Sequence, residues 1–377
     1  MIDPKDYLET LASHDINFFS GVPDSLLKEF CACVTDTFSE DNHIIAANEG
    51  AAVGLAIGHH LGTGRIPLIY LQNSGLGNII NPLLSLASPE VYGIPMLIMI
   101  GWRGEPGLKD EPQHVHQGRV MISMLKAMNI DSIVLSDESK EAKIQTEKAI
   151  LSARKTNSPV ALLVRKGLFS SYDKKSSQSN LNISREDAII AAASVIESDA
   201  VIISTTGMAS RELFEYRASQ NEGHHRDFLT VGGMGHASQI ALGIALAQKH
   251  RPVYCFDGDG AAIMHMGSMA ISGQAKCDNF IHIIFNNGAH ASVGGQPTVG
   301  LDISFSKIAE ACGYSSILSV DTRDELLSAI TDSQKATNTG ASFIEVKTGA
   351  KNRKDIGRPT ATPSQNKTDL MKFLVKG

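Results

Sequence analysis

The sequence predicts an α/β protein made of two doubly wound parallel sheets. Three observations lead to this fold class. Short apolar runs recur along the chain and end in Gly or polar residues, as buried parallel strands do. Segments of helical length separate these runs, and parallel pairing needs such crossovers. A stretch rich in Ser, Lys and Asn interrupts the alternation near the middle, so each half of the chain should form a sheet of its own.

The strand-like runs lie on both sides of that stretch. They are expected near 43–48, 67–72, 95–100, 131–135 and 159–165, and again near 201–204, 252–256, 280–285 and 342–346. We therefore predict an N-terminal domain over residues 1–170, a linker over 171–184 and a C-terminal domain over 185–377. A chain of 377 residues leaves no room for a third domain between them.

In the first half, the run His43–Asn48 is followed at once by Glu49 and by a helical segment of small residues, Gly50–Gly58. A carboxylate at a strand end, beside a helix that can pack closely, is a candidate functional group. A solvated Glu near a helix start, favoured there by the helix dipole, is the alternative. Three further segments follow expected strands and are dense in Gly, Pro and polar residues, as functional loops often are. They are Ser20–Leu27, Gln72–Asn78 and Gly101–His114.

The most informative pattern of the second half runs from Asp257 to Ala289. Phe-Asp-Gly-Asp-Gly and Phe-Asn-Asn-Gly-Ala end two apolar runs, and a predicted crossover helix, Ala262–Ala275, joins them. Because ligands gather at the carboxyl ends of parallel strands, Asp259 and Asn287 should face one crevice. Their side-chain oxygens and the carbonyl of Ala289 suit Mg²⁺, which prefers oxygen ligands and keeps positions for phosphate and water. Ordinary Asp-Gly and Asn-Gly turns are the alternative.

Two more segments of the second half fit an anion site. Ser204–Ser210 lies between an expected strand and a helix that starts near Ser210, where hydroxyls and free amides favour anions. The Gly-rich segment Val231–Ser238 precedes a predicted helix, Ile240–Gln248. A plain helix cap and a flexible turn are the respective alternatives.

Together these motifs resemble the signatures of the thiamine diphosphate (ThDP) enzymes. Gly258-Asp259-Gly260, a spacer and Asn286-Asn287 match the diphosphate-binding signature. The resemblance covers nearly the whole chain and implies two ThDP-binding domains without a middle domain. It also implies ThDP and Mg²⁺ as cofactors, with Asp259, Asn287 and the main chain of Ala289 as metal ligands and Gly258 and Gly260 beside the cofactor.

The same resemblance assigns further residues to the cofactor. Glu49 would bond to the pyrimidine nitrogen and share the proton that activates the thiazolium ring, so we expect it in an apolar, desolvated environment. Met234 would be the apolar wedge under the cofactor, with Gly232 and Met234 supplying backbone contacts. The diphosphate cradle would consist of Thr206, Gly207 and Met208.

Within this family, the loops of the first half resemble phosphonopyruvate decarboxylases, with sulfopyruvate decarboxylases as near relatives. The resemblance implies decarboxylation of 3-phosphonopyruvate to phosphonoacetaldehyde and CO₂ in phosphonate biosynthesis. A substrate with a carboxylate and a phosphonate needs cationic groups, and we predict Arg103, Lys109 and Arg358 in this role. Pairing of Arg103 with Glu105 or Asp110 is the alternative.

Asp24 and His114 are the predicted proton-transfer residues, since His titrates near neutral pH. Asp24 has an equally reasonable role in the turn after Pro23. Sulfopyruvate decarboxylation, an acetolactate synthase-like carboligation and noncatalytic ThDP binding stay open as alternatives. The family implies a homodimer or higher homo-oligomer, because Glu49 and the diphosphate motif usually meet across a subunit boundary.

Composition excludes several classes of function. The net charge is −6 and no basic run is present, which argues against nucleic-acid binding. No segment has the pattern of a signal peptide or a membrane span, so we expect a cytoplasmic enzyme acting on a small 2-oxo acid. The five cysteines form no CxxC pair and are expected to be reduced thiols. A dinucleotide-binding oxidoreductase is disfavoured, because Gly-x-Gly-x-x-Gly follows no expected strand.

Overall fold

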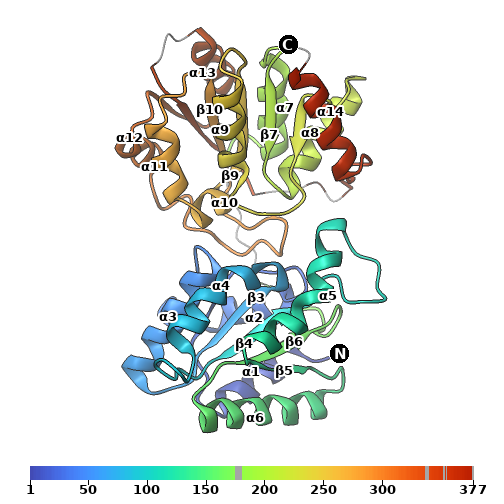
Figure 1. Cartoon of the computed structure of the whole chain (residues 1–377), viewed down its shortest axis with the longest axis vertical. Helices are drawn as coiled ribbons and strands as arrows, with labels where there is room; N and C mark the ends of the chain where they lie inside the picture. The colour runs from blue at the N-terminus through green and yellow to red at the C-terminus, as the bar shows by residue number, and fades with distance from the viewer. Residues whose placement is uncertain (175–180, 336–338, 351–352, 354, 376–377) are drawn as a thin grey trace. The chain divides into compact units, whose positions relative to one another are not determined.

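The computed structural model divides the chain into two compact units, Met1–Ser176 and Ser177–Gly377 (Figure 1). It describes residues 1–174, 181–335, 339–350, 353 and 355–375. Each unit is built on one six-stranded sheet whose paired strands all run parallel. The predicted fold class is therefore confirmed. Part of the predicted linker, residues 175–180, lies outside the described residues.

In the N-terminal unit the strand order is β2-β1-β3-β4-β6-β5. The strands are β1 (Phe19–Gly21), β2 (His43–Ile45), β3 (Leu68–Gln72), β4 (Leu97–Gly101), β5 (Asp131–Val134) and β6 (Val160–Val164). The helices are α1 (Pro4–Ala12), α2 (Lys28–Thr37), α3 (Glu49–Thr63), α4 (Leu76–Pro82), α5 (Pro112–Ala127) and α6 (Ser139–Thr156). The apolar residues of α1, α2 and α6 form a core on one face of the sheet, and those of α3, α4 and α5 form another on the opposite face.

The C-terminal unit has the order β11-β12-β10-β9-β7-β8. The strands are β7 (Val201–Ser204), β8 (Asp227–Leu229), β9 (Val253–Gly258), β10 (Phe280–Asn286), β11 (Ser316–Val320) and β12 (Ser342–Lys347). One face is covered by α7 (Arg185–Val195), α8 (Met208–Ser219) and α13 (Arg323–Lys335). The other face is covered by α9 (Ala237–Ala247), α10 (Asp259–Met264), α11 (Gly267–Gln274), α12 (Phe305–Cys312) and α14 (Pro363–Val375).

The two sheets have the same topology. When the strands are numbered from one within each unit, both orders become 2-1-3-4-6-5. In such a sheet the chain leaves the first and third strands in opposite directions, which opens a crevice at their carboxyl ends. The loops after β1 and β3, and those after β7 and β9, therefore lie where a doubly wound fold places its ligands.

All nine strand-like runs seen in the sequence form strands, but several other expectations were wrong. Three strands were missed: β1 and β8 have three residues each, and β11 is a half-exposed edge strand with a weak apolar pattern. The predicted strand at 43–48 ends at Ile45, because Asn48 caps α3 by accepting a hydrogen bond from the amide of Ala51 (2.9 Å). The predicted helix Ala262–Ala275 is instead two helices, since the backbone leaves the helical conformation at His265.

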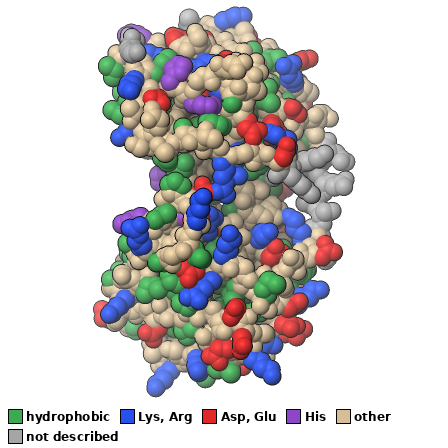
Figure 2. Space-filling view, turned by 90° about the vertical axis from the view of Figure 1, so that its right-hand side faces the viewer, with side chains coloured by type: hydrophobic (Ala, Val, Ile, Leu, Met, Phe, Trp, Pro, Cys, Tyr) green, Lys and Arg blue, Asp and Glu red, His purple; other side chains and the backbone are tan. Residues whose placement is uncertain are grey.

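The surface and the cysteines agree with the composition. Acidic and basic side chains are interspersed over the face shown in Figure 2. All five cysteines are free thiols, and four of them are buried. Among the helices that the described residues form, none has both the length and the apolar character needed to cross a bilayer.

Candidate active site

Asp259 lies at the carboxyl end of β9, where the sequence predicted a metal ligand. It is the first residue of α10 and is buried, with 2% of its surface exposed. The hydroxyl of Thr298 donates a hydrogen bond to Oδ2. Burial raises the pKa of Asp259, and the bond from Thr298 and backbone amides oppose that shift. Since an uncompensated buried carboxylate is costly, this group suits a bound cation.

Asn287 and Ala289 follow the neighbouring strand, β10. Because Phe285 pairs with Gly258 across the two strands, Asn287 emerges at the same edge of the sheet as Asp259. Asn287 is buried, and its Oδ1 accepts a hydrogen bond from the amide of Ala289 (3.1 Å). Amide, carboxylate and carbonyl oxygens are the donor set that Mg²⁺ prefers, so these residues fit the metal that the family implies.

One pocket in the C-terminal unit collects most of the residues predicted for the cofactor. This pocket is partly open to solvent. The predicted residues that line it are Thr206, Met208, Met234, Gly258, Asp259, Gly260, Asn287 and Ala289. Gly207 and Gly232 do not line it, but Gly207 is the N-cap residue of α8 beside the cradle.

Three polar lining residues lie outside the segments predicted from the sequence, namely Arg185, His290 and Ser292. The Thr205 hydroxyl is buried and has no hydrogen-bond partner among the described residues, so a bound anion would satisfy it. Arg185 forms a buried ion pair with Glu212 (2.8 Å), which compensates its charge. Sequence reasoning missed this arginine because it lies far from every Gly-rich motif.

The segment around Met234 is an ordered turn. Gly233 and Gly235 have φ values of +66° and +83°, a conformation that side chains with Cβ rarely adopt. His236 Nδ1 lies 3.1 Å from the carbonyl oxygen of Gly233 and 3.2 Å from that of Met234. Its ring packs edge-on against His265, with the centroids 4.6 Å apart. These contacts hold Met234 at the pocket wall.

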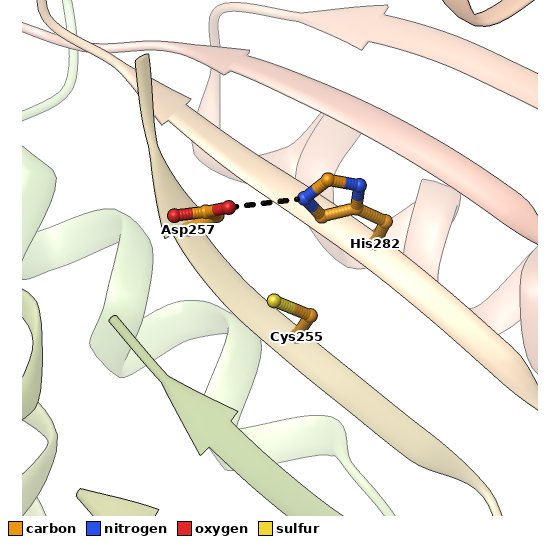
Figure 3. Close-up of side chains that lie close together, drawn as sticks. All are labelled: Cys255, Asp257 and His282. Atoms are coloured by element: carbon orange, nitrogen blue, oxygen red, sulfur yellow. Dashed lines mark hydrogen bonds and ion pairs between the residues drawn. The ribbon is translucent and has the colours of Figure 1, made fainter. Parts of the chain in front are cut away.

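Cys255, Asp257 and His282 lie together on β9 and β10 (Figure 3), and Asp257 also lines the pocket. Asp257 Oδ2 is 3.4 Å from His282 Nε2, and His282 Nδ1 is 3.1 Å from the hydroxyl of Tyr314. Burial, followed by the nearby Asp257, raises the pKa of Cys255 well above its usual range. The cluster consists of a buried Asp257–His282 pair beside a buried thiol.

Glu49 is the first residue of α3 in the N-terminal unit. It is buried within that unit, with 6% of its surface exposed, so the alternative of a fully solvated Glu does not apply. Asn78 Nδ2 donates a hydrogen bond to Oε2 (2.7 Å). A Cβ atom on Gly75 would stand 2.2 Å from Oε1, so only Gly fits beside the carboxylate. One carboxylate oxygen is held by Asn78 and the other faces the Gly75 turn.

Asp24 follows β1 and is fully buried. Gln72 at the end of β3 donates to Oδ1 (2.6 Å), and the amide of Leu26 donates to Oδ2 (3.0 Å). Burial raises the pKa of Asp24, while these bonds and Arg103 lower it by less. Asp24 therefore has the predicted role in the turn, through its bond to Leu26. Its raised pKa also favours the protonated carboxyl group.

Arg103 is bonded within the N-terminal unit. Its Nε donates to Asp110 Oδ2 (2.8 Å), a second nitrogen bonds Asp110 Oδ1, and Nη1 donates to Ser25 (2.9 Å). Of the two alternatives for pairing, Asp110 is therefore the partner, and Glu105 pairs with Arg165. Lys109 is exposed on the same loop.

His114 and Arg358 differ from their expected settings. His114 is buried on the first turn of α5, and burial, with a smaller contribution from Arg103, lowers its pKa to about 4. The lowered pKa favours the neutral imidazole at neutral pH, and the role of His114 in proton transfer stays a prediction. Its Nδ1 has no hydrogen-bond partner among the described residues. Arg358 is exposed in the C-terminal unit and does not line the pocket.

Comparison with known proteins agrees with this geometry. Residues 5–125 match the N-terminal TPP binding domain of thiamine pyrophosphate enzymes, and residues 205–346 match the C-terminal TPP binding domain. The chain belongs to the thiamine pyrophosphate enzyme family, as its motifs predicted. Thiamine pyrophosphate is the same compound as ThDP.

Within that family, the chain is similar to two phosphonopyruvate decarboxylases. It is 30% identical to the protein of Streptomyces viridochromogenes, over 97% of this chain and 93% of that protein. It is also 30% identical to the protein of Streptomyces hygroscopicus, over 97% and 92% of the two chains. The sulfopyruvate decarboxylase of Methanosarcina acetivorans is 26% identical over 87% of each chain.

Proposed function

We propose that this protein is a ThDP- and Mg²⁺-dependent decarboxylase that converts 3-phosphonopyruvate to phosphonoacetaldehyde and CO₂. The observation that carries the proposal is the pocket in which Asp259, Asn287 and Ala289 meet the turn Thr205–Met208. Similarity to phosphonopyruvate decarboxylases over almost the whole chain supports the choice of substrate. The downstream context we propose is phosphonate biosynthesis.

The residues of the C-terminal unit would hold the cofactor. Asp259, Asn287 and the Ala289 carbonyl are the proposed Mg²⁺ ligands, and the start of α8 is the proposed diphosphate cradle, because helix N-termini bind anions. Met234 would support the cofactor from the pocket wall. ThDP, when bound, supplies the electron sink that decarboxylation of a 2-oxo acid requires.

The residues of the N-terminal unit would handle protons. Glu49 would hold or release a proton at the pyrimidine ring through the oxygen that Asn78 leaves free. Asp24, whose pKa is raised by burial, is the proposed proton donor to the product. His114, neutral and with an unpartnered Nδ1, would orient substrate by a hydrogen bond rather than supply a proton as a cation.

Side-by-side assays test this function. The protein, supplied with ThDP and MgCl₂, is given phosphonopyruvate, sulfopyruvate and pyruvate, and the release of CO₂ and aldehyde is followed. We expect phosphonopyruvate to give the highest kcat/KM and turnover to cease when either cofactor is left out. A higher kcat/KM on sulfopyruvate would favour the second candidate, which the Methanosarcina acetivorans relative supports. A carboligation product in place of aldehyde would overturn both.

A further inference from the structure

Thr298 connects the Asp259 carboxylate to the loop that follows β10. Its hydroxyl donates to Asp259 Oδ2 and accepts a hydrogen bond from the amide of Gly300 (3.1 Å). Because a hydroxyl has a single proton, the bond accepted from Gly300 leaves that proton for Asp259. The hydroxyl is therefore oriented as a donor, and Oδ2 is the oxygen that it occupies.

The backbone beyond Thr298 closes the same side of the carboxylate. A Cβ atom on Gly300 would stand 2.6 Å from Asp259 Oδ2 and 2.7 Å from Asn286 Oδ1. The side-chain Nδ2 of Asn286 in turn donates a hydrogen bond to the carbonyl oxygen of Gly300 (2.6 Å). Oδ2 is thus bonded by Thr298 and covered by Gly300, so we assign cation binding to Oδ1.

Thr298 also closes the loop that carries pocket residues. Its amide donates to the carbonyl of Gly288 (2.9 Å), Ala289 and Pro297 form an antiparallel bridge, and the amide of His290 donates to Gln296 (2.8 Å). The loop is a closed hairpin with Asn287 and Ala289 at one end of its base and Thr298 at the other. Thr298 therefore joins two strand ends that supply the proposed metal ligands.

We propose that Thr298 is a positioning residue of the metal centre. It fixes the rotation of the Asp259 carboxylate so that Oδ1 faces the cation, and it holds the Ala289 end of the hairpin against the same site. This inference rests on the proposed role of Asp259 as a metal ligand. Groups that orient metal ligands typically change metal affinity by about 10- to 100-fold when they are removed.

The test compares three substitutions at two threonine residues. Thr298→Val keeps the shape of the side chain and removes the hydroxyl, whereas Thr298→Ser restores it. Thr348→Val is the matched control, because the Thr348 hydroxyl is fully buried and has no partner within the described part of the chain. The dissociation constant of Mg²⁺ is measured by calorimetry on the full chain at saturating ThDP, and the melting temperature of the apo protein is recorded.

We expect Thr298→Val to weaken Mg²⁺ binding about 10- to 100-fold, while Thr298→Ser and Thr348→Val stay within about threefold of the parent. Gly300→Ala provides a second route to the same loss if Thr298→Val does not fold. Parent-like Mg²⁺ affinity in Thr298→Val, or equal losses in the Val and Ser variants, would overturn the inference.

Asp259→Asn separates this inference from the proposed function. If Asp259→Asn binds Mg²⁺ and ThDP like the parent, the metal assignment itself is wrong. If Asp259→Asn loses Mg²⁺ and Thr298→Val does not, Asp259 remains the ligand and only the role of Thr298 is rejected.

Discussion

At the scale of single residues, the two cations predicted on the loop after β4 differ, because Arg103 is hydrogen-bonded and Lys109 is exposed. Arg103 gives its guanidinium to Asp110 and Ser25, and its backbone exchanges hydrogen bonds with Asn73 (2.7 and 3.1 Å). These contacts tie the loops after β1, β3 and β4 together. Lys109 lies exposed on the last of these loops. We therefore propose that Arg103 positions these loops and that Lys109 recognises the phosphonate of the proposed substrate.

This division predicts different kinetic effects for two alanine variants. Arg103→Ala leaves the partly buried Asp110 without its partner, so we expect a lower melting temperature and similar losses of kcat/KM on phosphonopyruvate and pyruvate. Lys109→Ala should keep the parent melting temperature and lose about 10-fold or more on phosphonopyruvate alone, which corresponds to one charged contact of about 1.4 kcal/mol. A selective phosphonopyruvate defect in Arg103→Ala would reverse the two roles.

His114 gives a prediction on pH. Its pKa is about 4 in the folded protein and near 6.5 in an unfolded chain, so the unfolded state binds more protons between these values. The free energy of unfolding therefore falls as the pH decreases from about 6.5 towards 4, because the unfolded chain takes up a proton at His114 that the folded protein does not. His43, whose pKa burial also lowers to about 4, acts in the same direction.

We therefore expect His114→Gln to melt with a weaker dependence on pH between about 4 and 6.5 than the parent. The measurement is the unfolding midpoint of the N-terminal unit, followed by the fluorescence of Trp102, the only tryptophan. His116→Gln, at an exposed position of the same helix, is the control. An unchanged slope in His114→Gln would show that the imidazole is not buried as a neutral group.

Some site residues could be predicted from the sequence and others could not. Asp259, Asn287 and Glu49 were predictable, because each follows an apolar run and adjoins Gly or small residues. Arg185, Gln72 and Thr298 were not, because each acts through a contact between segments far apart in the chain. The neutrality of His114 was equally hidden, since it depends on burial by neighbours that its own helix does not show.

At the scale of elements, the turns beside the functional carboxylates require close approach of the backbone. The turn between β3 and α4 passes Glu49 so closely that a Cβ atom on Gly75 would overlap with the carboxylate. Gly77, two residues later on α4, has no heavy atom within 4 Å of the corresponding position. The two glycines thus share Leu76 as a sequence neighbour but have different surroundings in space.

This contrast predicts opposite outcomes for the same substitution. Gly75→Ala should displace the Glu49 carboxylate and reduce turnover by about 100-fold or more, the usual value of a proton-transfer residue, while the chain stays folded. Gly77→Ala should keep activity and stabilise α4 by up to about 1 kcal/mol, because Ala has the higher helix propensity. Turnover and thermal unfolding of both variants check this. Parent-like turnover in Gly75→Ala would remove Glu49 from the proton path.

Elements were predicted where the pattern was long and missed where it was short. The central strands β9 and β10 have six and seven residues and are mostly apolar, whereas β1 and β8 have only three residues each. The break between α10 and α11 was missed as well, because Met, Ala, Ile and Gly continue through it without a proline. The end of α10 is set by a tertiary contact, because the side chain of His265, where the helix ends, lies against Gly235.

At the scale of the whole molecule, equivalent strands of the two sheets lead to candidate functional residues in each unit. Glu49 follows the second strand of its unit and Met234 follows the second strand of the other. Asp24 and Thr205 follow the first strands, and the third and fourth strands lead to Gln72 and Arg103 in one unit and to Asp259 and Asn287 in the other. The shared topology thus places the candidate residues of each unit after equivalent strands, although the two halves show no evident sequence repeat.

Both units also present uncharged helical surfaces. From Gly50 to Pro89 the chain has a single charged residue, Arg65, and Leu55, Leu61 and Leu84 of this stretch are exposed. In the C-terminal unit, Ile240, Leu246 and Ile271 are exposed on α9 and α11, which carry no Asp, Glu, Lys or Arg. Surfaces that lack charge and expose apolar side chains are typical of the centres of permanent interfaces.

We therefore predict that the protein is at least a homodimer in solution. Light scattering coupled to size exclusion should give a mass of at least twice the 40.4 kDa of one chain. Leu55→Glu places a charge on α3 and should shift the mass towards 40.4 kDa and reduce turnover, since a buried unpaired charge at an interface is strongly unfavourable. Leu151→Glu is the matched control, because Leu151 is 58% exposed on α6, a helix rich in charged residues. A monomeric parent with full activity would contradict the prediction, as would equal dissociation by both variants.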